Sequence, residues 1–327
     1  MEVSLGFWIG FVAFVLIMLL LDLFVFHKKD SVMKVKTALL WSAFWIGLAV
    51  IFNIGIYFVV GNTAGFELGR QKALEFLTGY LIEESLSVDN LFVFILIFGF
   101  FNIDPKFQHK ILFWGIIGAI VMRAVFIFAG VALIQQFVWV MYIFGAILIY
   151  SGLNLLFEKK DAEDFNPDKN IAIKIFKKLM PVTDDMSVPH FFVKKNKIVY
   201  ATPFFVALLL IEVSDLIFAV DSIPAVLSVS KDPFIVYTSN IFAILGLRSL
   251  YFALNGIMGY FHYLKYALAG ILTFIGVKMC VNEFSHSYGD QFGFHVHISN
   301  FLSLGVIVSL LTISIIASVI VQKKQGN

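Results

Sequence analysis

Two apolar segments of the sequence carry acidic side chains where a chain that meets lipid usually carries none. The segments are "YLIEESLSVDNLFVF", residues 80–94, and "LLLIEVSDLIFAVDSIPAVL", residues 208–227. Their acids are Glu83, Glu84, Asp89, Glu212, Asp215 and Asp221. A charge at the centre of a bilayer is costly, and such residues usually face a bundle interior or an ion pathway. Both segments are therefore candidates for an intramembrane cation or proton site.

The neighbouring polar residues narrow the kind of cation. Hydroxyl and amide oxygens are added by Ser85, Ser87, Asn90, Ser214 and Ser222, and neither segment contains Cys, His or Met. Hard cations such as Mg²⁺, Ca²⁺ and Mn²⁺ prefer oxygen ligands, whereas zinc and copper sites use nitrogen and sulfur. The two segments therefore favour a hard divalent cation.

Few basic residues balance these acids. Arg123 and Arg248 lie inside other apolar runs, and two arginines leave an excess of negative charge. We interpret them either as structural counter-charges or as groups that replace the cation in the empty site. Asp22, near the end of the first apolar run, either lines the path or lies at the interface. Asn154 and Asn240 are interpreted as contacts between helices.

Helical geometry limits which acids cooperate. Glu83, Ser87 and Asn90 share one helix face, whereas Asp89 points elsewhere, so all six acids cannot bind one ion. Pro224 follows Asp221 by three residues and cannot donate a backbone hydrogen bond. A helix broken there would offer free carbonyls beside Asp221, as discontinuous transporter helices do.

The composition places the whole chain in a membrane. Of its 327 residues, 60% are hydrophobic and only 14% are charged, against about 25% charged in a soluble domain. A helix needs about 20 apolar residues to cross the hydrocarbon core. The apolar runs are Leu5–Phe26, Thr37–Val60, Leu74–Phe101, Ile111–Ile134, Phe137–Phe157, Ala201–Val229, Phe234–Met258, Tyr263–Val281 and Ile298–Val321. We predict an all-α polytopic membrane protein with about nine transmembrane helices.

The distribution of Lys and Arg predicts the orientation. Most of the 24 basic residues fall in alternate connections, above all in 158–200, and such connections face the cytoplasm. We expect the N-terminus outside and the C-terminus inside a cell membrane, the inner membrane of the cell. The first apolar run lacks a basic flank and a cleavage site, so we expect it to be retained.

The middle of the chain contains a repeat. When Asn90 is aligned with Asp215, Arg123 falls on Arg248 and Gly145 falls on Gly270. Three spans match the next three, which predicts a 3+3 inverted-topology repeat with a site at the interface of its halves. The expected organisation is 1–73 for two N-terminal helices, 74–157 for the first half, 158–200 for a cytoplasmic loop, 201–282 for the second half, and 283–327 for an outer loop and the last helix.

The two acidic segments resemble the signatures of the TerC family of integral membrane proteins, in particular its Alx-like branch. "IEESLSVDNLFVF" is similar to the first signature and "EVSDLIFAVDSIPA" to the second, and the likeness extends through "AIVMRAVFIFAG" and "DPFIVYTSNIFAILGLRSLYF". The resemblance implies export of divalent metal, chiefly Mn²⁺. It implies metal ligation by Glu83, Asp89, Asn90, Glu212, Asp215 and Asp221. The other candidates, for the pathway or for counter-charge, are Glu84 (on a variable position of the signature), Ser87, Ser214, Ser222, Arg123, Arg248 and Asp22.

These observations predict a secondary transporter that exports Mn²⁺, with Ca²⁺ as the alternative ion and proton exchange through one acid. No P-loop occurs, so we expect no ATPase. A membrane hydrolase is a weaker third option, since no His or Ser–His arrangement is expected at midplane depth; we therefore expect no enzyme and no permanently bound cofactor. The expected partners are the cation and the lipid bilayer, without nucleic acid; a homo-oligomer is left open. The alternative function is a membrane scaffold that assists the insertion or metal loading of exported proteins.

Overall fold

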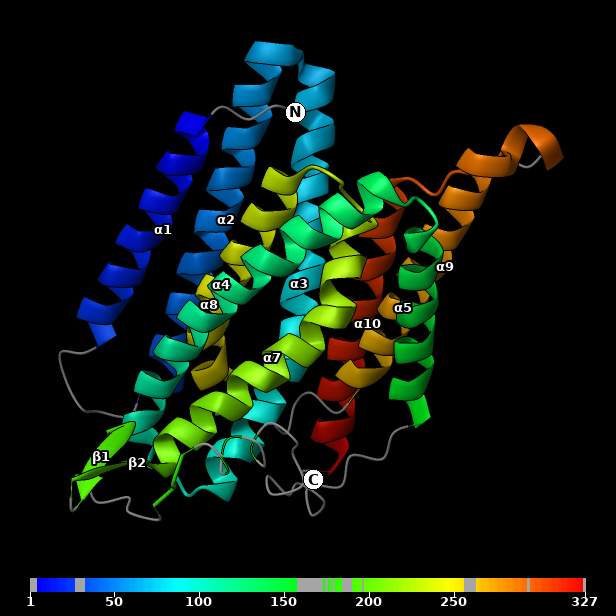
Figure 1. Ribbon diagram of the computed structural model, residues 1–327. Coiled ribbons are helices and arrows are strands. Elements are labelled where there is room, and N and C mark those ends of the chain that lie inside the picture. Colours follow the sequence, from blue (N-terminus) through cyan, green and yellow to red (C-terminus); the bar gives the residue numbers. More distant parts are fainter. Residues whose placement is uncertain are drawn as a thin grey trace.

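The computed structural model shows a bundle of long helices with a small β-hairpin at one end (Figure 1). The structure describes residues 5–26, 33–157, 173, 176, 178, 180–183, 190–195, 197–255, 263–292 and 295–325. The helices are α1 (Leu5–Phe26), α2 (Val35–Ala64), α3 (Phe66–Phe100), α4 (Pro105–Gln136), α5 (Val140–Phe157), α7 (Pro203–Leu227), α8 (Pro233–Asn255), α9 (Leu264–Phe292) and α10 (Asn300–Gln325).

The helices confirm a polytopic membrane protein. Within the described residues, seven helices are long and apolar enough to cross a membrane, namely α2, α4, α5, α7, α8, α9 and α10. α1 contributes a shorter apolar stretch, Leu5–Leu21, and α3 carries the acids of the first segment. The count of nine transmembrane helices stays a prediction.

The hairpin was not anticipated from the sequence. Its strands are β1 (Phe192–Lys195) and β2 (Ile198–Ala201), which pair antiparallel with Phe192 opposite Ala201. Lys197 begins the return with a φ of 66°, a left-handed turn conformation. Ala201, where the predicted span began, belongs to β2, and α7 begins at Pro203. Proline is favoured in the first turn of a helix.

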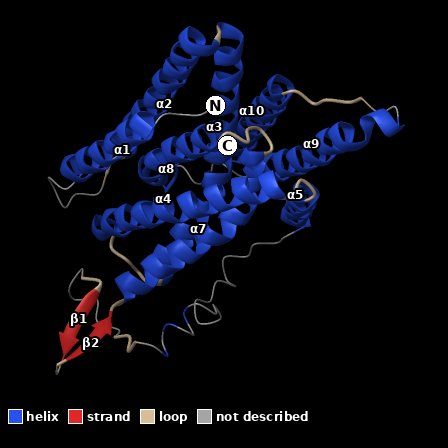
Figure 2. Cartoon of the chain, turned by 45° about the horizontal axis from the view of Figure 1, so that its top comes forward, coloured by secondary structure: helices blue, strands red, loops and turns tan. Residues whose placement is uncertain are grey.

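The two ends of the bundle carry different elements (Figures 1 and 2). The hairpin, the connection from α3 to α4 and the end of α10 lie at one end of the bundle, and we call this the hairpin end. The start of α1, the turn from α7 to α8 and the connection from α9 to α10 lie at the other, distal end. The hairpin, which is the described end of the segment 158–200, thus lies at the same end of the bundle as the end of α10. The orientation of the chain in the membrane stays a prediction. α9 extends to Phe292, so residues 283–292, which were expected to start the outer loop, are helical.

The core surrounds α8. Its apolar window is 94% buried, against 17% in α10 and 22% in α2, and it contacts α2, α3 and α4. α3 also packs against α7, and α7 packs against α4. The exposed faces of α1, α2 and α10 are rich in Leu, Ile and Phe, which suits contact with lipid tails. α3 and α4 of the first predicted half thus each contact both α7 and α8 of the second half. The inverted repeat itself stays a prediction.

α5 and α9 meet along a seam of small residues. A Cβ on Gly276 would lie 2.7 Å from the carbonyl oxygen of Gly145, and a Cβ on Gly152 would lie 2.7 Å from that of Ala269. Small residues let two membrane helices bring their backbones into contact. The seam therefore fixes α5 against α9, on the side of the bundle where the acids of α3 and α7 lie.

Asp104 starts α4 on the hairpin end. Its side chain accepts a hydrogen bond of 3.0 Å from the backbone nitrogen of Lys106 and lies 3.1 Å from the Lys106 ammonium. These two contacts hold the pKa of Asp104 below its usual value, with the backbone hydrogen bond as the main cause. The residue caps the helix on which Arg123 lies.

Candidate functional site

Arg123 of α4 is the centre of a buried polar cluster between α3, α4, α7 and α8. Its side chain is 1% exposed. Nη2 donates to Asp215 Oδ1 at 2.9 Å and Nε donates to Asp215 Oδ2 at 3.3 Å, while Nη1 donates to Glu83 Oε1. The planar guanidinium thus engages the carboxylate of α7 with two parallel bonds and that of α3 with a third. We call Arg123, Glu83 and Asp215 the arginine centre.

Two further acceptors complete the surroundings of the guanidinium. Asn240 Oδ1 on α8 lies 2.9 Å from Nη1, and Ser222 Oγ on α7 lies 3.5 Å from it. Asn240 is held in this orientation because its Nδ2 donates to the carbonyl of Val236 at 3.1 Å. The arginine centre therefore joins four helices through one side chain.

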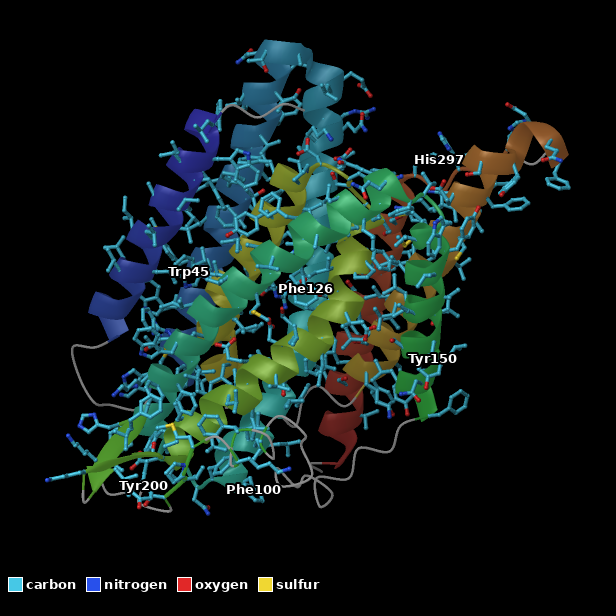
Figure 3. The ribbon with its side chains drawn as sticks, in the orientation of Figure 1. Trp45, Phe100, Phe126, Tyr150, Tyr200 and His297 are labelled. Atoms are coloured by element: carbon cyan, nitrogen blue, oxygen red, sulfur yellow. The ribbon has the colours of Figure 1, made fainter. Side chains whose placement is uncertain are left out.

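A cavity of about 360 Å³ borders the arginine centre. Its polar lining consists of Glu83, Asn90, Ser151, Asn154, Asp221 and Ser222. Ser151 Oγ of α5 donates to Asp221 Oδ1 at 2.8 Å. α3 and α7 contribute Glu83, Asn90, Asp221 and Ser222, while the residues of α5 and α9 that line the cavity lie in the second half of α5 and the first turns of α9. The cavity therefore occupies the part of the bundle nearer the hairpin end. Tyr150, 70% exposed, stands at its rim near the end of α5 (Figure 3).

Two oxygens of this cavity's lining residues lack a hydrogen-bond donor among the described residues. They are Glu83 Oε2 and Asn90 Oδ1, on side chains that are 0% and 2% exposed. Glu83 Oε1 accepts from Arg123 Nη1 and from Ser87 Oγ, the latter at 3.2 Å, and Asn90 Nδ2 makes only a long contact of 3.5 Å to Asp215 Oδ1. A buried acceptor without a donor costs about 1–3 kcal/mol, and more when it is charged. Such a pair of acceptors is explained when a cation or an ordered donor fills the space between them.

α7 passes the cavity without a break. The helix continues through Pro224 to Leu227, so the expected interruption near Asp221 is wrong. A proline within a helix is tolerated in membrane proteins when neighbouring groups satisfy the freed backbone. The carbonyl of Val220 nevertheless lacks its usual donor, because Pro224 has no backbone N–H. Asp221 is therefore presented by a continuous helix rather than by a helix end.

The predicted site residues divide into two groups. The structure brings Glu83, Asn90, Asp215 and Asp221 to one centre and its cavity, together with Ser87, Ser222 and Arg123. Glu212 lies apart from this centre: its carboxylate packs directly against Gly118 of α4, where a Cβ would overlap with it. Glu84 lies beside Tyr80 one turn earlier on α3. Ser214 is half-buried on α7.

Three more predicted residues have other outcomes. Arg248 is buried on α8 and lines, with Asp215, a small gap between α3, α4, α7 and α8. The side chains of Asp89 and Asp22 lie outside the described residues, although both belong to helices. Among the described side chains, no three of His, Cys, Asp or Glu lie close enough together to hold a metal. A cation at this site would therefore use amide and hydroxyl oxygens beside its carboxylates.

Two members of the site could not be connected to their partners from the sequence. Asn240 was interpreted as a contact between helices, which the structure confirms, because Asn240 on α8 accepts from Arg123 on α4. Ser151 holds Asp221 from α5, and its only signal was a position beside the glycine-rich face of that helix. Both residues lie far in sequence from the partners that they contact, so no local pattern could connect them.

A second buried polar cluster lies at the distal end. Lys72 of α3 is 2.8 Å from Glu75 Oε2 and 3.5 Å from Asp232 Oδ2. Ser230 Oγ donates to Glu75 Oε2 at 2.6 Å, and Gln71 Nε2 donates to Glu75 Oε1 at 3.0 Å. These contacts tie α3 to the turn between α7 and α8. We call Lys72, Glu75 and Asp232 the lysine cluster.

An apolar helical bundle with a buried arginine–carboxylate centre defines an integral membrane protein with an intramembrane polar site. The chain belongs to the integral membrane protein TerC family, whose model matches residues 68–326. This range includes both acidic segments and every described residue of the arginine centre.

The chain is similar over nearly its whole length to several named relatives. It is 47% identical to "Uncharacterized membrane protein STKORF319" of Myxococcus xanthus, with 97% of this chain and 93% of the relative covered. It is 43% identical to "Putative membrane-bound redox modulator Alx" of Salmonella typhi, with 94% and 92% covered. An uncharacterized membrane protein of Rickettsia bellii is 43% identical, with 96% and 97% covered. No solved structure matches the chain.

Proposed function

We propose that this protein is a secondary transporter that exports hard divalent cations, with Mn²⁺ as the preferred ion and Ca²⁺ as the alternative. The observation that carries the proposal is the pair of buried oxygens without donors, Glu83 Oε2 and Asn90 Oδ1, on residues that line a cavity shared with Asp221. Two carboxylates and an amide oxygen around one space form the start of an oxygen cage for a cation.

The lining chemistry supports a hard ion. The polar residues of the cavity supply carboxylate, amide and hydroxyl oxygens, and the described lining contains neither Cys, His nor Met. Oxygen sets of this kind suit Mg²⁺, Ca²⁺ and Mn²⁺. The number of ready ligands is small, so binding would draw in further oxygens, and Ser222 of α7 is among the residues that line the cavity.

The arrangement of the two ends supports alternating access. The cavity lies toward the hairpin end, whereas the lysine cluster ties the helices together at the distal end. Charge in the sequence favours a cytoplasmic location for the hairpin end. The structure then corresponds to a carrier that receives its ion from the cytoplasm. Export requires the lysine cluster to part and the cavity to close, as rocking of two repeat halves would accomplish.

Proton exchange completes the proposed cycle. The cavity and the arginine centre hold three described carboxylates, and a buried site with fewer cations than acids readily takes up protons when the metal leaves. A proton returning on one acid would offset half of the positive charge that leaves with a divalent cation. The structure favours Asp221 for this role, because its described hydrogen-bond partner is the neutral hydroxyl of Ser151.

The test is Mn²⁺ flux by purified protein in proteoliposomes, with an imposed pH gradient and a clamped membrane potential. We expect flux in wild-type vesicles and none above the leak of empty vesicles in Asp221→Asn. A wild-type protein that carries no divalent cation under any gradient would contradict the proposal. It would favour the membrane scaffold, whose partner function should survive substitution of the acids.

A further inference from the structure

We propose that the β-hairpin is a membrane anchor that lies in the headgroup layer of the bilayer, with its lysines on lipid phosphates. The surface of the hairpin exposes apolar and basic side chains together. Phe192, Ile198 and Val199 are 44%, 51% and 45% exposed. Lys194 and Lys197 are exposed among them. Such an anchor goes beyond the proposed transport function and does not depend on it.

The pairing of the strands places both kinds of side chain on one face. Residues directly opposite each other share a face, as does every second residue along a strand. Phe192 pairs with Ala201, and Lys194 pairs with Val199. Phe192, Lys194 and Val199 therefore lie on the same face. A lysine can cover apolar surface with its methylene groups while its ammonium reaches a polar layer, so this face suits the boundary between lipid tails and headgroups.

The hairpin lies at the depth where headgroups are expected. Thr202 alone separates Ala201, the end of β2, from Pro203, where the candidate membrane span of α7 begins. In Figure 3, Tyr200 of β2 lies level with Phe100 at the end of α3. The headgroup layer is about 5–8 Å thick on each side of the bilayer core, and a strand of four residues such as β1 is about 13 Å long. A hairpin beside the helix ends stays within this layer, and Figure 1 shows the hairpin beside the lower ends of α4 and α7.

The hairpin is attached to the start of α7. Thr202 Oγ1 donates to the carbonyl of His190 at 2.6 Å, and the backbone nitrogen of Thr202 donates to the carbonyl of Phe191 at 3.1 Å. The ring centroid of Phe192 lies 4.6 Å from that of Phe205 on α7. A two-stranded hairpin is marginally stable in water by itself. These contacts therefore fix its position relative to the first turn of α7, and an anchored hairpin in turn fixes the depth at which α7 begins.

The lysines of the hairpin are available to a partner. Among the described side chains, neither Lys194 nor Lys197 has an acidic partner, whereas Lys231 at the distal end lies 3.8 Å from Glu283. Lysines beside a bilayer are attracted to anionic lipid headgroups. The basic and the apolar side chains thus favour the same partner, the headgroup layer of the protein's own membrane. This layer is continuous with the lipid that the exposed faces of the helices contact.

The first test measures the depth of the hairpin by spin labelling. Val199→Cys is labelled in a Cys280→Ser background, because Cys280 is the only cysteine of the chain. The full-length protein is placed in vesicles that contain phosphatidylglycerol, and access of oxygen and of a water-soluble nickel complex to the label reports its depth. Glu67→Cys is the reference in water, because the Glu67 side chain is 83% exposed at the start of α3. Ile313→Cys, 63% exposed in the middle of α10, is the reference in lipid.

We expect the Val199 label to lie between the two references, with clearly less access to nickel than the Glu67 label. Access equal to that of the Glu67 label would overturn the anchor. Spin–spin coupling between the Val199 labels of two molecules would also overturn it, because a second copy would then cover the face. If Val199→Cys does not fold, Ile198→Cys on the same strand decides by the same criteria.

The second test addresses the lysines. Native mass spectrometry measures binding of phosphatidylglycerol to the full-length protein in detergent. Lys194→Gln and Lys197→Gln should each weaken this binding by about fivefold, the scale of one lysine beside an anionic surface. Lys231→Gln is the matched control at the distal end and should leave the binding unchanged. Hairpin variants that bind the lipid as wild type does would overturn the contact between lysines and phosphates.

Discussion

The arginine centre and the lysine cluster are built alike, but they differ in whether every carboxylate oxygen has a hydrogen-bond or ion-pair partner. Each places one cationic side chain between two buried carboxylates, Arg123 between Glu83 and Asp215, and Lys72 between Glu75 and Asp232. In the lysine cluster, both oxygens of each carboxylate meet a donor or the ammonium. In the arginine centre, Glu83 keeps one oxygen without a described donor.

The difference distinguishes a clamp from a site. A satisfied buried network holds elements together and has no need of a ligand. An unsatisfied carboxylate oxygen on the wall of a cavity is costly to maintain, and the cost is recovered when an ion binds. Sequence alone shows acids in both places. The two roles are distinguished by whether each carboxylate oxygen has a hydrogen-bond or ion-pair partner in the structure.

Asp221→Asn should have the largest effect on transport and a small effect on folding. The amide keeps the shape of the side chain and its bond to Ser151 but removes a charge from the cavity wall. We expect Mn²⁺ flux in proteoliposomes to fall by at least about thirtyfold, in line with the loss of a charged ligand partner. Flux at the wild-type rate, in protein of unchanged melting temperature, would remove Asp221 from the site.

Lys72→Met should have the opposite profile. Removing one partner of a buried ion pair costs about 3–5 kcal/mol because the remaining charges lose their compensation. We expect a clear drop in the thermal unfolding temperature in detergent, while Mn²⁺ still binds, since the lysine cluster lies outside the cavity lining. Loss of Mn²⁺ binding without loss of stability would contradict the assignment of a clamp.

Glu84→Gln should be milder than either. Glu84 neighbours Glu83 in sequence, but it lies beside Tyr80 and is absent from the lining of the cavity. We expect flux to change by no more than about threefold, the scale of a single modest hydrogen bond. A loss as large as that of Asp221→Asn, measured in the same vesicles, would extend the ion site to the other face of α3.

Cys280→Ser should have the smallest effect. Cys280 is the only cysteine of the chain, and its Sγ faces Gly145 in the seam between α5 and α9. Serine is nearly isosteric, so we expect unchanged flux and the same response to oxidant as wild type. A flux that depends on the thiol would support the redox role that is printed in the name of the Alx relatives.

The helices were predictable because a span in lipid must be apolar and continuous. α1 matches its predicted run, Leu5–Phe26; α2 and α4 extend their runs at both ends, whereas α5 and α7 are slightly shorter than theirs. α9 departs most, because residues past Val281 are polar, so hydropathy ends the span while hydrogen bonding continues the helix to Phe292. The hairpin β1–β2 was not predicted, because its strands have four residues each and lie among lysines. Hydropathy does not distinguish such short polar strands from a loop.

The candidate site was predictable in its residue types and not in its partners. The excess of acids indicated the elements α3 and α7, and the two buried arginines were evident. Which carboxylate meets which arginine depends on helix rotation and depth, which sequence spacing does not determine. Glu212 shows this limit: it lies one turn before Asp215 on α7, yet it faces Gly118 of α4 rather than the guanidinium.

The most direct test of the central claim is to locate the ion. A structure of the wild-type protein with Mn²⁺, using anomalous scattering at the manganese edge, should show one intramembrane peak in the cavity. We predict that the peak lies within direct coordination distance of Glu83 Oε2, Asn90 Oδ1 and the carboxylate of Asp221, with Arg123 still paired to Asp215. A peak at the lysine cluster, or an empty cavity in protein that carries Mn²⁺ across vesicles, would contradict the account.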